Sequence, residues 1–364
     1  MPDLTTLLGL LEHDSPTGHE GPAVDWLLER MQTLGFEVEK DEAGNGIGKM
    51  GAGPRQVILL GHIDTVPGRI PVRLETDPKL GPCLFGRGAV DAKGPLACFV
   101  DAVAQLGPRQ GWQFVVIAAV DEEGDSRGAR ALLDHYRPHF LIVGEPNRWH
   151  RIALAYKGSA WAELHLRAEN RHSAHHDPTP AEQAIALWLR LQAWAEAFNR
   201  ERKRLFDQLL LTLRAFNTLE EDFYTSVRLR LGARLPLDLP PQAWYRELEH
   251  LAAPFQVQPL GYAVPAWECE KNTPLVRAFM RAIRQQGGEV AFVQKSGTSD
   301  LNIVAPHWRC PALVYGPGDS ALDHTPHEHI PIDEYLRGVA VLTEALRLLT
   351  TSSNEPPPSD RAPS

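Results

Sequence analysis

Apolar and polar positions along the first 150 residues predict helices and strands in alternation. Apolar residues recur at helical spacing in two amphipathic segments, residues 4–11 and 24–31. Continuous apolar runs with β-branched residues, typical of strands buried on both faces, occupy residues 56–61, 114–120 and 140–144. Helical patterns separate these strands at residues 96–106 and 126–136, and Ser126 is the expected N-cap of the second. This alternation predicts an α/β fold with a mostly parallel sheet and helices on both faces.

Beyond residue 156 the pattern changes. Two segments that alternate apolar and polar residues flank a long helical segment, which runs from Pro180 to about Arg204. They predict an α+β unit whose antiparallel sheet is polar on one face. The earlier pattern resumes from about Trp267 and ends in a helix from Ile332 to Leu349. We therefore expect a discontinuous α/β domain interrupted by an inserted domain, with boundaries at 1–155 and 266–348 for the first and 156–265 for the second.

Composition narrows the class of protein. The 364 residues are 43% hydrophobic and 23% charged, as in ordinary globular proteins, and are numerous enough for two domains. No apolar run is long enough to cross a membrane, and the N-terminus lacks a secretion signal, so we expect a cytoplasmic protein. The four cysteines form no CxxC pair, which argues against a thiolate zinc site. A net charge of −9 argues against nucleic acid as a partner, and the polar, Pro-rich residues 349–364 predict a disordered tail.

Acidic and histidine residues gather where predicted strands end. Asp121, Glu122 and Glu123 directly follow an apolar run, although like charges repel. Either these residues form a solvated loop tip, or a cation binds there. Open α/β sheets bind ligands at the carboxyl ends of their strands, and such stretches recur as GHIDTVP, GRGAVDAKG, VDEEGDSRG, LIVGEPN and ALDHTPHEH. A surface charge, a helix cap or a core histidine explains any one of them, but five in succession predict a shared site.

The residue types in these stretches suit a metal centre. His62 and Asp64 are two apart and share a face in extended chain, as a ligating imidazole and its supporting carboxylate do. Adjacent acids such as Glu122 and Glu123 can serve one site only where the strand has ended, which Gly124 would permit. Imidazole and carboxylate ligands favour Zn²⁺ and also accept Co²⁺ or Mn²⁺. Two cations bridged by one carboxylate would polarise a carbonyl, and a remaining carboxylate would be the general base.

The motifs HIDTVP, GRGAVDAKG, DEEGDSRGA, VGEP and HTPHEHI resemble, in order, those of the co-catalytic zinc aminoacylases and carboxypeptidases. That family includes acetylornithine deacetylase, succinyl-diaminopimelate desuccinylase and carboxypeptidase G, and the resemblance spans roughly residues 4 to 348. It implies a di-zinc aminopeptidase-like α/β domain, with an inserted lid through which subunits form a homodimer or a higher homo-oligomer.

The resemblance also implies a set of metal ligands. Asp91 would bridge two zinc ions. His62 and Glu145 would complete the protein ligands of one ion, and Glu123 and His324 those of the other.

The resemblance also implies roles for two further acidic residues of these motifs. Glu122 would be the general base that deprotonates the bridging water, and Asp64 would orient the His62 ring. The peptide bond between Asp91 and Ala92 would be cis, as is usual in the family.

Two stretches of the inserted domain resemble substrate-binding elements of the family. NRHSAHHDPTPAEQAI resembles a segment that lends a histidine to the neighbouring subunit as an oxyanion donor. His175 fits best, with His176 and His172 as alternatives. VRLRLGARLPLDLPP resembles a strand whose arginine binds the substrate α-carboxylate; Arg234 fits best. The alternatives there are Arg228, Arg230 or an ordinary surface strand.

A loop near residue 297 resembles the family's substrate-side loop. In its sequence KSGTSD, three residues would offer hydrogen bonds to the substrate: Ser296, Gly297 and Thr298. Asp300 fits a structural role equally well, and the later GPGD is expected to be a turn that brings His324 into place.

The substrate class is indicated by GAVDAKGPLACF and KSGTSDLNIV, which are similar to the lysine/ornithine hydrolases that act on an amino-group carrier protein. Those enzymes release lysine or ornithine from the γ-carboxyl of the carrier's C-terminal Glu in lysine and arginine biosynthesis. The basic run at 199–204 would then bind an acidic carrier, although a solvated helix face also explains it. The alternatives are an acetylornithine deacetylase or general aminoacylase, and a non-catalytic metal-binding regulator. The regulator is disfavoured because Glu122 and all five ligand positions are present.

Overall fold

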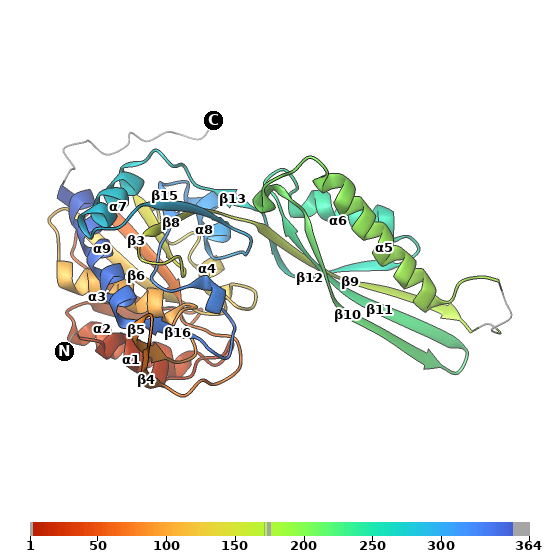
Figure 1. Ribbon diagram of the computed structural model, residues 1–364, viewed down its shortest axis with the longest axis horizontal. Helices are drawn as coiled ribbons and strands as arrows, with labels where there is room; N and C mark the ends of the chain where they lie inside the picture. The colour runs from red at the N-terminus through yellow and green to blue at the C-terminus, as the bar shows by residue number, and fades with distance from the viewer. Residues whose placement is uncertain (1–2, 171, 173–175, 352–364) are drawn as a thin grey trace. The chain divides into compact units, whose positions relative to one another are not determined.

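The computed structural model describes residues 3–170, 172 and 176–351 (Figure 1). Two compact units divide the chain. Unit 1 comprises Met1–Leu154, Cys269–Val293 and Trp308–Ser364, and unit 2 comprises Ala155–Glu268 and Gln294–His307. The segment from Gln294 to His307 thus groups with the residues of the inserted region, while the functional division into a catalytic and a lid domain remains a prediction.

The largest sheet has nine strands and a parallel centre. In the middle of the sheet, four neighbouring strands run parallel in the order β6 (Trp112–Ala119), β3 (Arg55–His62), β7 (Phe140–Gly144) and β15 (Ala312–Val314). The outer strands are antiparallel to their neighbours: β1 (Glu37–Lys40) and β2 (Gly46–Met50) on one side, β8 (Arg151–Tyr156) and β13 (Trp267–Glu268) on the other. A further strand, β14 (Ala291–Lys295), pairs with β8. The apolar runs are thus buried strands, and the predicted α/β class is confirmed.

Helices of unit 1 pack on this sheet and on one another. The helix α3 (Lys93–Leu106) contacts β3, β6 and β7, and α9 (Ile332–Thr351) packs against both α3 and α7 (Pro274–Gln285). Residues from Lys93 to Val100 of α3 are all buried, as expected of a helix enclosed between a sheet and a second helix. Two N-terminal helices also belong to unit 1, α1 (Thr5–Glu12) and α2 (Gly21–Thr33).

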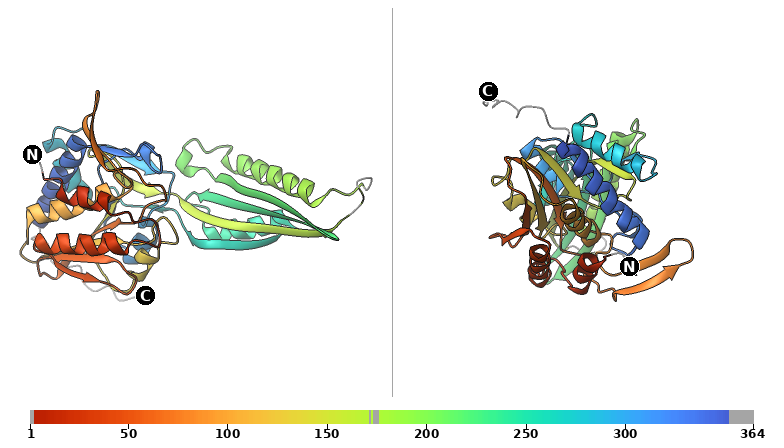
Figure 2. Two further views of the ribbon diagram at one scale, coloured as in Figure 1. Left: turned by 90° about the horizontal axis from the view of Figure 1, so that it is seen from below. Right: turned by 90° about the vertical axis from the view of Figure 1, so that its left-hand side faces the viewer.

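Unit 1 also contains a separate antiparallel sheet, which lies next to two of the sequence motifs in the chain. It consists of β4 (Arg73–Asp77), β5 (Gly81–Phe85) and β16 (His329–Pro331). The β4–β5 hairpin protrudes from the rest of unit 1 (Figure 2, orange). The GRGAVDAKG motif therefore follows an antiparallel strand, so our expectation that it ends a parallel strand was wrong. Pairing of β5 with β16 brings this motif beside HTPHEH, because Ile330 lies opposite Leu84.

Unit 2 contains a four-stranded antiparallel sheet with two helices on one face (Figure 1). Its strands follow the order β10 (Leu210–Glu221), β11 (Tyr224–Leu235), β9 (Gly158–Glu169) and β12 (Gln256–Val264). In β11, Val227 and Leu229 are buried under the helices while Arg228 and Arg230 are exposed, which is the predicted alternation. The helices are α5 (Pro180–Asn199) and α6 (Pro241–Ala252). A capping box at Thr179 and Glu182 begins α5.

Several local expectations need correction. The predicted helix at 126–136 is only α4 (Arg127–Ala131), and Ser126 makes no side-chain capping bond because its backbone is left-handed, with φ 51°. The long helix of unit 2 ends at Asn199, and a short 3₁₀ helix, η1 (Leu205–Asp207), follows. The predicted disordered tail begins as helix, since α9 continues to Thr351; residues 352–364 lie outside the described part. All four cysteines are free. No helix among the described residues is long and apolar enough to cross a membrane.

Candidate metal centre

The predicted ligands are presented by the ends of strands and the turns after them. His62 is the last residue of β3, and Glu145 directly follows β7. Glu123 lies in the turn after β6, and these three parallel strands end at the same edge of the sheet. Asp91 reaches this edge from the turn between β5 and α3. His324 reaches it from the loop after η2 (Ser320–Leu322).

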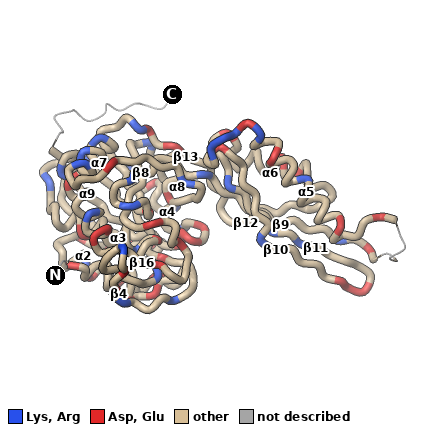
Figure 3. Tube along the Cα trace, viewed as in Figure 1, with Lys and Arg blue, Asp and Glu red and all other residues tan. Residues whose placement is uncertain are grey.

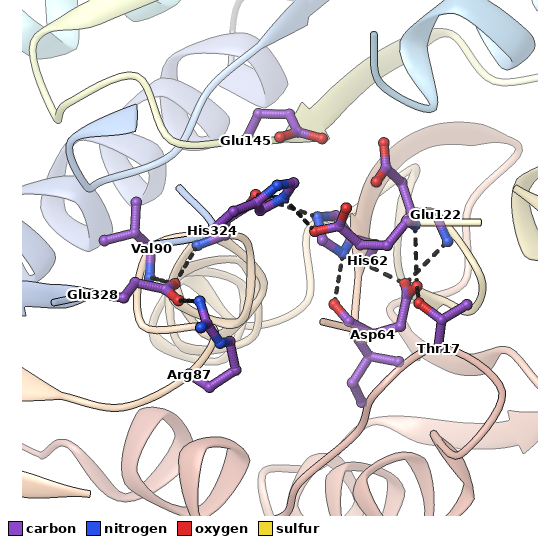
Figure 4. Close-up of polar contacts among 12 residues, drawn as sticks. Thr17, His62, Asp64, Arg87, Val90, Glu122, Glu145, His324 and Glu328 are labelled. Carbon is purple, nitrogen blue, oxygen red and sulfur yellow. Dashed lines mark hydrogen bonds and ion pairs between the residues drawn. The ribbon is translucent and has the colours of Figure 1, made fainter. Parts of the chain in front are cut away.

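These five residues form two groups that share Asp91. Figure 4 labels three of them, His62, Glu145 and His324. We call His62, Asp91 and Glu145 the first ligand group, and Asp91, Glu123 and His324 the second. Within each group the candidate ligand atoms all lie within 4.8 Å of one another. The sequence therefore identified every member of both groups, although their roles as metal ligands remain a prediction. The peptide bond between Asp91 and Ala92 is cis, as the resemblance implied.

In the first group, His62 is held from both sides of its ring. Its Nδ1 lies 2.9 Å from the carbonyl oxygen of Asp64 and 3.5 Å from the carboxylate Oδ1, and its Nε2 lies 3.2 Å from Oδ1 of Asp91. Burial favours the neutral ring, but hydrogen bonds with Asp64 and Asp91 outweigh burial and raise the pKa of His62 well above its usual value. A ring whose Nδ1 donates to a carbonyl presents the Nε2 lone pair to a cation.

The Asp64 carboxylate is fully buried and holds the turn that carries the two glutamates. It accepts hydrogen bonds from the backbone nitrogens of Glu122 (3.0 Å) and Glu123 (3.1 Å) and from the hydroxyl of Thr17 (2.9 Å). Burial opposes its charge, but the contact with His62 and the hydrogen bonds from Thr17 and the backbone of Glu122 lower the pKa of Asp64. The predicted orientation of His62 thus comes chiefly from the Asp64 carbonyl, while the side chain fixes the positions of Glu122 and Glu123.

The turn after β6 is made by Asp121 rather than by Gly124. The strand ends at Ala119, and Asp121 adopts a left-handed backbone with φ 67°, whereas Gly124 does not. Our expectation that Gly124 permits the break was therefore wrong. Gly124 is needed for space instead, because an added Cβ there would lie 2.5 Å from Oδ1 of Asp121. Because of this turn, the side chains of Glu122 and Glu123 need not point to opposite faces of the sheet, as neighbouring residues on a strand do.

In the second group, His324 contacts two carboxylates. Its Nε2 lies 3.0 Å from Oδ2 of Asp91 and 2.8 Å from Oε1 of Glu123. Hydrogen bonds to Asp91 and Glu123 raise the pKa of His324 from 6.5 to about 10. Burial alone would raise the pKa of Asp91, but its bonds to His324 and His62 lower it. Three carboxylates and two imidazoles converge in two groups of three, a donor set that fits two divalent cations of the zinc type.

Comparison with known proteins places this arrangement in a family. The model of Peptidase family M20/M25/M40 matches residues 58–348. The chain belongs to this family. Its M20 relatives include a "[LysW]-lysine hydrolase" of Deinococcus radiodurans, 39% identical over 345 residues that cover 92% of this chain and 93% of the relative. A "[LysW]-lysine/[LysW]-ornithine hydrolase" of Sulfurisphaera tokodaii is 29% identical over 350 residues, covering 94% of each chain.

Solved M20 structures share the fold of the chain. The metallo-carboxypeptidase Sso-CP2 of Sulfolobus solfataricus superposes with a TM-score of 0.78 at 16% identity, covering 96% of this chain and all of that one. A dinuclear metal binding peptidase of the M20 family from Bacillus subtilis superposes with a TM-score of 0.66 at 12% identity, covering 96% of each chain. At these identities the likeness shows the fold alone.

The candidate substrate residues of this M20 chain lie in unit 2. Nη1 of Arg234 donates to Oγ1 of Thr298 at 2.5 Å, so two predicted substrate-binding residues meet within the unit. Ser296 is exposed and Gly297 half-buried in the same loop. The alternatives Arg228 and Arg230 are both exposed, and the structure leaves their predicted role untested.

Asp300, which fits a structural role, is buried in the same loop. His175 lies outside the described residues, while its alternatives His172 and His176 are exposed.

Three further polar residues near the M20 ligand groups were not found from the sequence. Thr17 contacts Asp64, and Arg87 and Glu328 form a buried ion pair at 2.9 Å beside the Asp91 turn. Arg87 and Glu328 stand inside the recognised motifs GRGAVDAKG and HTPHEHI. Both are charged residues to which the motif comparison gives no role as a ligand or a base. Such an unassigned charge inside a motif could have indicated a supporting residue.

Proposed function

We propose that this chain is a metal-dependent amidohydrolase that releases lysine or ornithine from LysW. LysW would be the carrier protein, holding the amino acid on the γ-carboxyl of its C-terminal Glu, in lysine and arginine biosynthesis. The names of the relatives support this substrate. The observation that carries the chemistry is the convergence of two ligand groups on Asp91, with Glu122 in the adjoining turn.

Two divalent cations fit the two ligand groups. We propose Zn²⁺ in each, with Co²⁺ as a substitute, and Asp91 as the shared ligand. When bound, such ions supply a Lewis acid for the scissile carbonyl and lower the pKa of a water. With three protein ligands each, the two ions would still be able to take a water or the scissile carbonyl as a further ligand.

Glu122 is the general base in this proposal. Its backbone is fixed by Asp64, and its side chain in Figure 4 extends away from Asp64 towards the side on which Glu145 lies. A carboxylate there can take a proton from the attacking water and pass it to the nitrogen of the departing lysine or ornithine. The amide C–N bond then breaks, leaving the carrier's γ-carboxylate and the free amino group.

Recognition of the released amino acid falls to unit 2. Arg234 is proposed to bind the substrate α-carboxylate bidentately, with Thr298 holding the guanidinium in place. A histidine of the 172–176 segment, His175 by preference, would act as an oxyanion donor across a homodimer formed through unit 2. A cytoplasmic location completes the proposal.

Fewer residues of the basic run are available to bind a carrier than the sequence indicates. Within the basic run at 199–204 (Figure 3, blue), Arg202 donates twice to Asp238 at 3.0 and 2.8 Å, and Arg204 twice to Asp207 at 2.6 and 2.8 Å. Arg200 and Lys203 are exposed and have no ion-pair partner among the described residues. We therefore propose Arg200 and Lys203 as the cations that meet an acidic carrier.

A substrate comparison tests the proposed activity. The purified protein, loaded with Zn²⁺ or Co²⁺, is assayed on a LysW–lysine conjugate and on N-acetylornithine. We expect cleavage of the conjugate to be far faster. Cleavage of N-acetylornithine alone would replace the carrier substrate with the deacetylase alternative, and cleavage of neither would favour the non-catalytic regulator.

The docking surface has its own test. Changing Arg200 and Lys203 to Glu should raise KM for the conjugate severalfold at low ionic strength, with little effect on a small acyl-lysine substrate. The matched control is Arg190→Glu on the exposed face of α5. Equal effects of the control and the double variant would remove the assigned surface.

A further inference from the structure

The carboxylate of Glu328 joins the segments that carry the shared ligand and His324. Its residue is fully buried, and its Oε1 accepts hydrogen bonds from the backbone nitrogens of Val90 and Asp91, both at 2.9 Å. Its Oε2 accepts from Nη1 of Arg87, also at 2.9 Å. Figure 4 shows Glu328 between Val90 and Arg87. One side chain thus fixes the peptide that precedes the Asp91 side chain.

Arg87 extends this connection to the loop of His324. Its Nη1 also donates to the carbonyl oxygen of Thr325 at 3.1 Å, and its Nε donates to that of Gly68 at 2.9 Å. Thr325 is the residue directly after His324. The Arg87–Glu328 pair therefore contacts the backbone on both sides of the Asp91–His324 contact, which spans 3.0 Å from Oδ2 to Nε2.

We infer that Glu328 is a positioning residue of the metal centre, which acts through Asp91 and His324 and, with Arg87, sets the spacing of the second ligand group. This inference rests on the proposed function. His324 is half exposed and lies in a loop with left-handed backbone, so the sheet does not fix it as it fixes His62. Asp91 likewise stands in a turn rather than on a strand. Both ligands therefore depend on contacts from outside the sheet, and the Arg87–Glu328 pair makes those contacts.

The chemistry of this pair fits positioning better than general stabilisation. A buried ion pair loses the solvation of both charges, and apolar residues of similar volume often stabilise a protein equally well. A carboxylate that binds two backbone nitrogens and a guanidinium instead specifies geometry. Partners that orient metal ligands change metal affinity or activity by about 10- to 100-fold when they are removed.

Asp101 provides a matched control. Its carboxylate is also largely buried and accepts two hydrogen bonds, from the hydroxyls of Thr6 at 2.5 Å and Tyr335 at 2.6 Å. It lies on α3, and both of these hydrogen bonds come from residues outside the two ligand groups. Truncating Asp101 should therefore cost stability without a change at the metal centre.

The test compares Glu328→Ala, Glu328→Gln, Arg87→Lys and Asp101→Ala with the unmodified protein. Co²⁺ affinity is measured for both ions by competition with a chromophoric chelator, together with the visible Co²⁺ spectrum, the Tm of the metal-free protein, kcat and KM. We expect Glu328→Ala to weaken binding of at least one ion by about 10- to 100-fold. Its kcat should fall by a similar factor, KM should stay within about threefold, and the Co²⁺ spectrum should change.

Glu328→Gln should lose less affinity, because its amide oxygen can still accept from Val90 and Asp91 while its amide nitrogen faces Arg87. Asp101→Ala should lower Tm and leave Co²⁺ affinity and spectrum unchanged. The inference is overturned if Glu328→Ala lowers Tm but binds both ions as the unmodified protein does. If Glu328→Ala does not fold, Glu328→Gln and Arg87→Lys decide by the same criterion. An unmodified protein that binds no divalent ion would instead overturn the proposed function.

Discussion

The two ligand groups share Asp91 but are built on different supports. In the first, His62 and Glu145 are 2% and 8% exposed and stand at the ends of adjacent parallel strands. In the second, the His324 side chain is 52% exposed and belongs to a loop with φ 60°. The sheet places His62 and Glu145, whereas Glu328 binds the backbone of Asp91 and Arg87 binds that of Thr325, the residue after His324. The two groups thus differ in how much of their support comes from the sheet.

The largest effect is expected from removing the ligand that both groups share. Asp91→Ala should weaken the binding of both ions and reduce kcat/KM by about 10³-fold or more, since losing several kcal/mol of charge stabilisation amounts to that factor. Metal content per chain and kcat/KM check this prediction. Two ions bound as tightly as before would mean that Asp91 is not shared.

Glu122→Gln separates catalysis from metal binding, because Glu122 belongs to neither group. We expect kcat to fall by about 10²- to 10⁴-fold, the range for loss of a general base, while both ions stay bound. Kinetic assay and metal analysis on the same sample provide the check. Unchanged turnover would assign the base to another residue.

Limited chelation compares the two groups directly. We expect one ion to leave about tenfold more readily than the other, because the exposed His324 is easier to displace than the enclosed His62. His324→Ala should then bind one ion with nearly unchanged affinity, and His62→Ala should weaken chiefly the ion of the first group. Stepwise dialysis with metal analysis measures this order, and simultaneous loss of both ions in every sample would contradict it. Re-adding Zn²⁺ or Co²⁺ should restore activity.

The smallest effect concerns the pH dependence of the metal-free protein. Bonds to Asp91 and Glu123 raise the pKa of His324 from 6.5 to about 10, so its charged ring stabilises the fold fully below pH 6.5. This contribution is lost as pH rises through 10. We expect the Tm of the chelated protein to fall more over that interval than the Tm of His324→Gln. The effect is modest because His324 is half exposed, and identical profiles would contradict it.

The sequence predicted the members of the centre better than the means by which they are held. His62, Glu123 and Glu145 follow buried apolar strands, so hydrophobic pattern alone brings them to one edge of the sheet. Asp91 follows the antiparallel strand β5, and His324 lies well beyond the end of the parallel strand β15, so the ordered motifs were the stronger indication of both. Their proximity depends on β5 pairing with β16, a long-range contact that no local pattern encodes.

Backbone detail and charge pairing were the least predictable features. Gly124 looked like the flexible residue of its turn, but Asp121 adopts the left-handed backbone because its own carbonyl and carboxylate accept bonds from the following residues. The basic run looked uniformly free, but Arg202 is paired with Asp238, thirty-six positions further along the chain. Neither the bonds to Asp121 nor the Arg202–Asp238 ion pair produces a periodic pattern of apolar and polar residues from which it could be predicted.

The Asp64 carboxylate, which binds the backbone of both Glu122 and Glu123, has a consequence for both residues. Any exchange that shifts this one buried acid would displace the proposed base and a proposed second-group ligand together, so proton transfer and ion retention would change as one property.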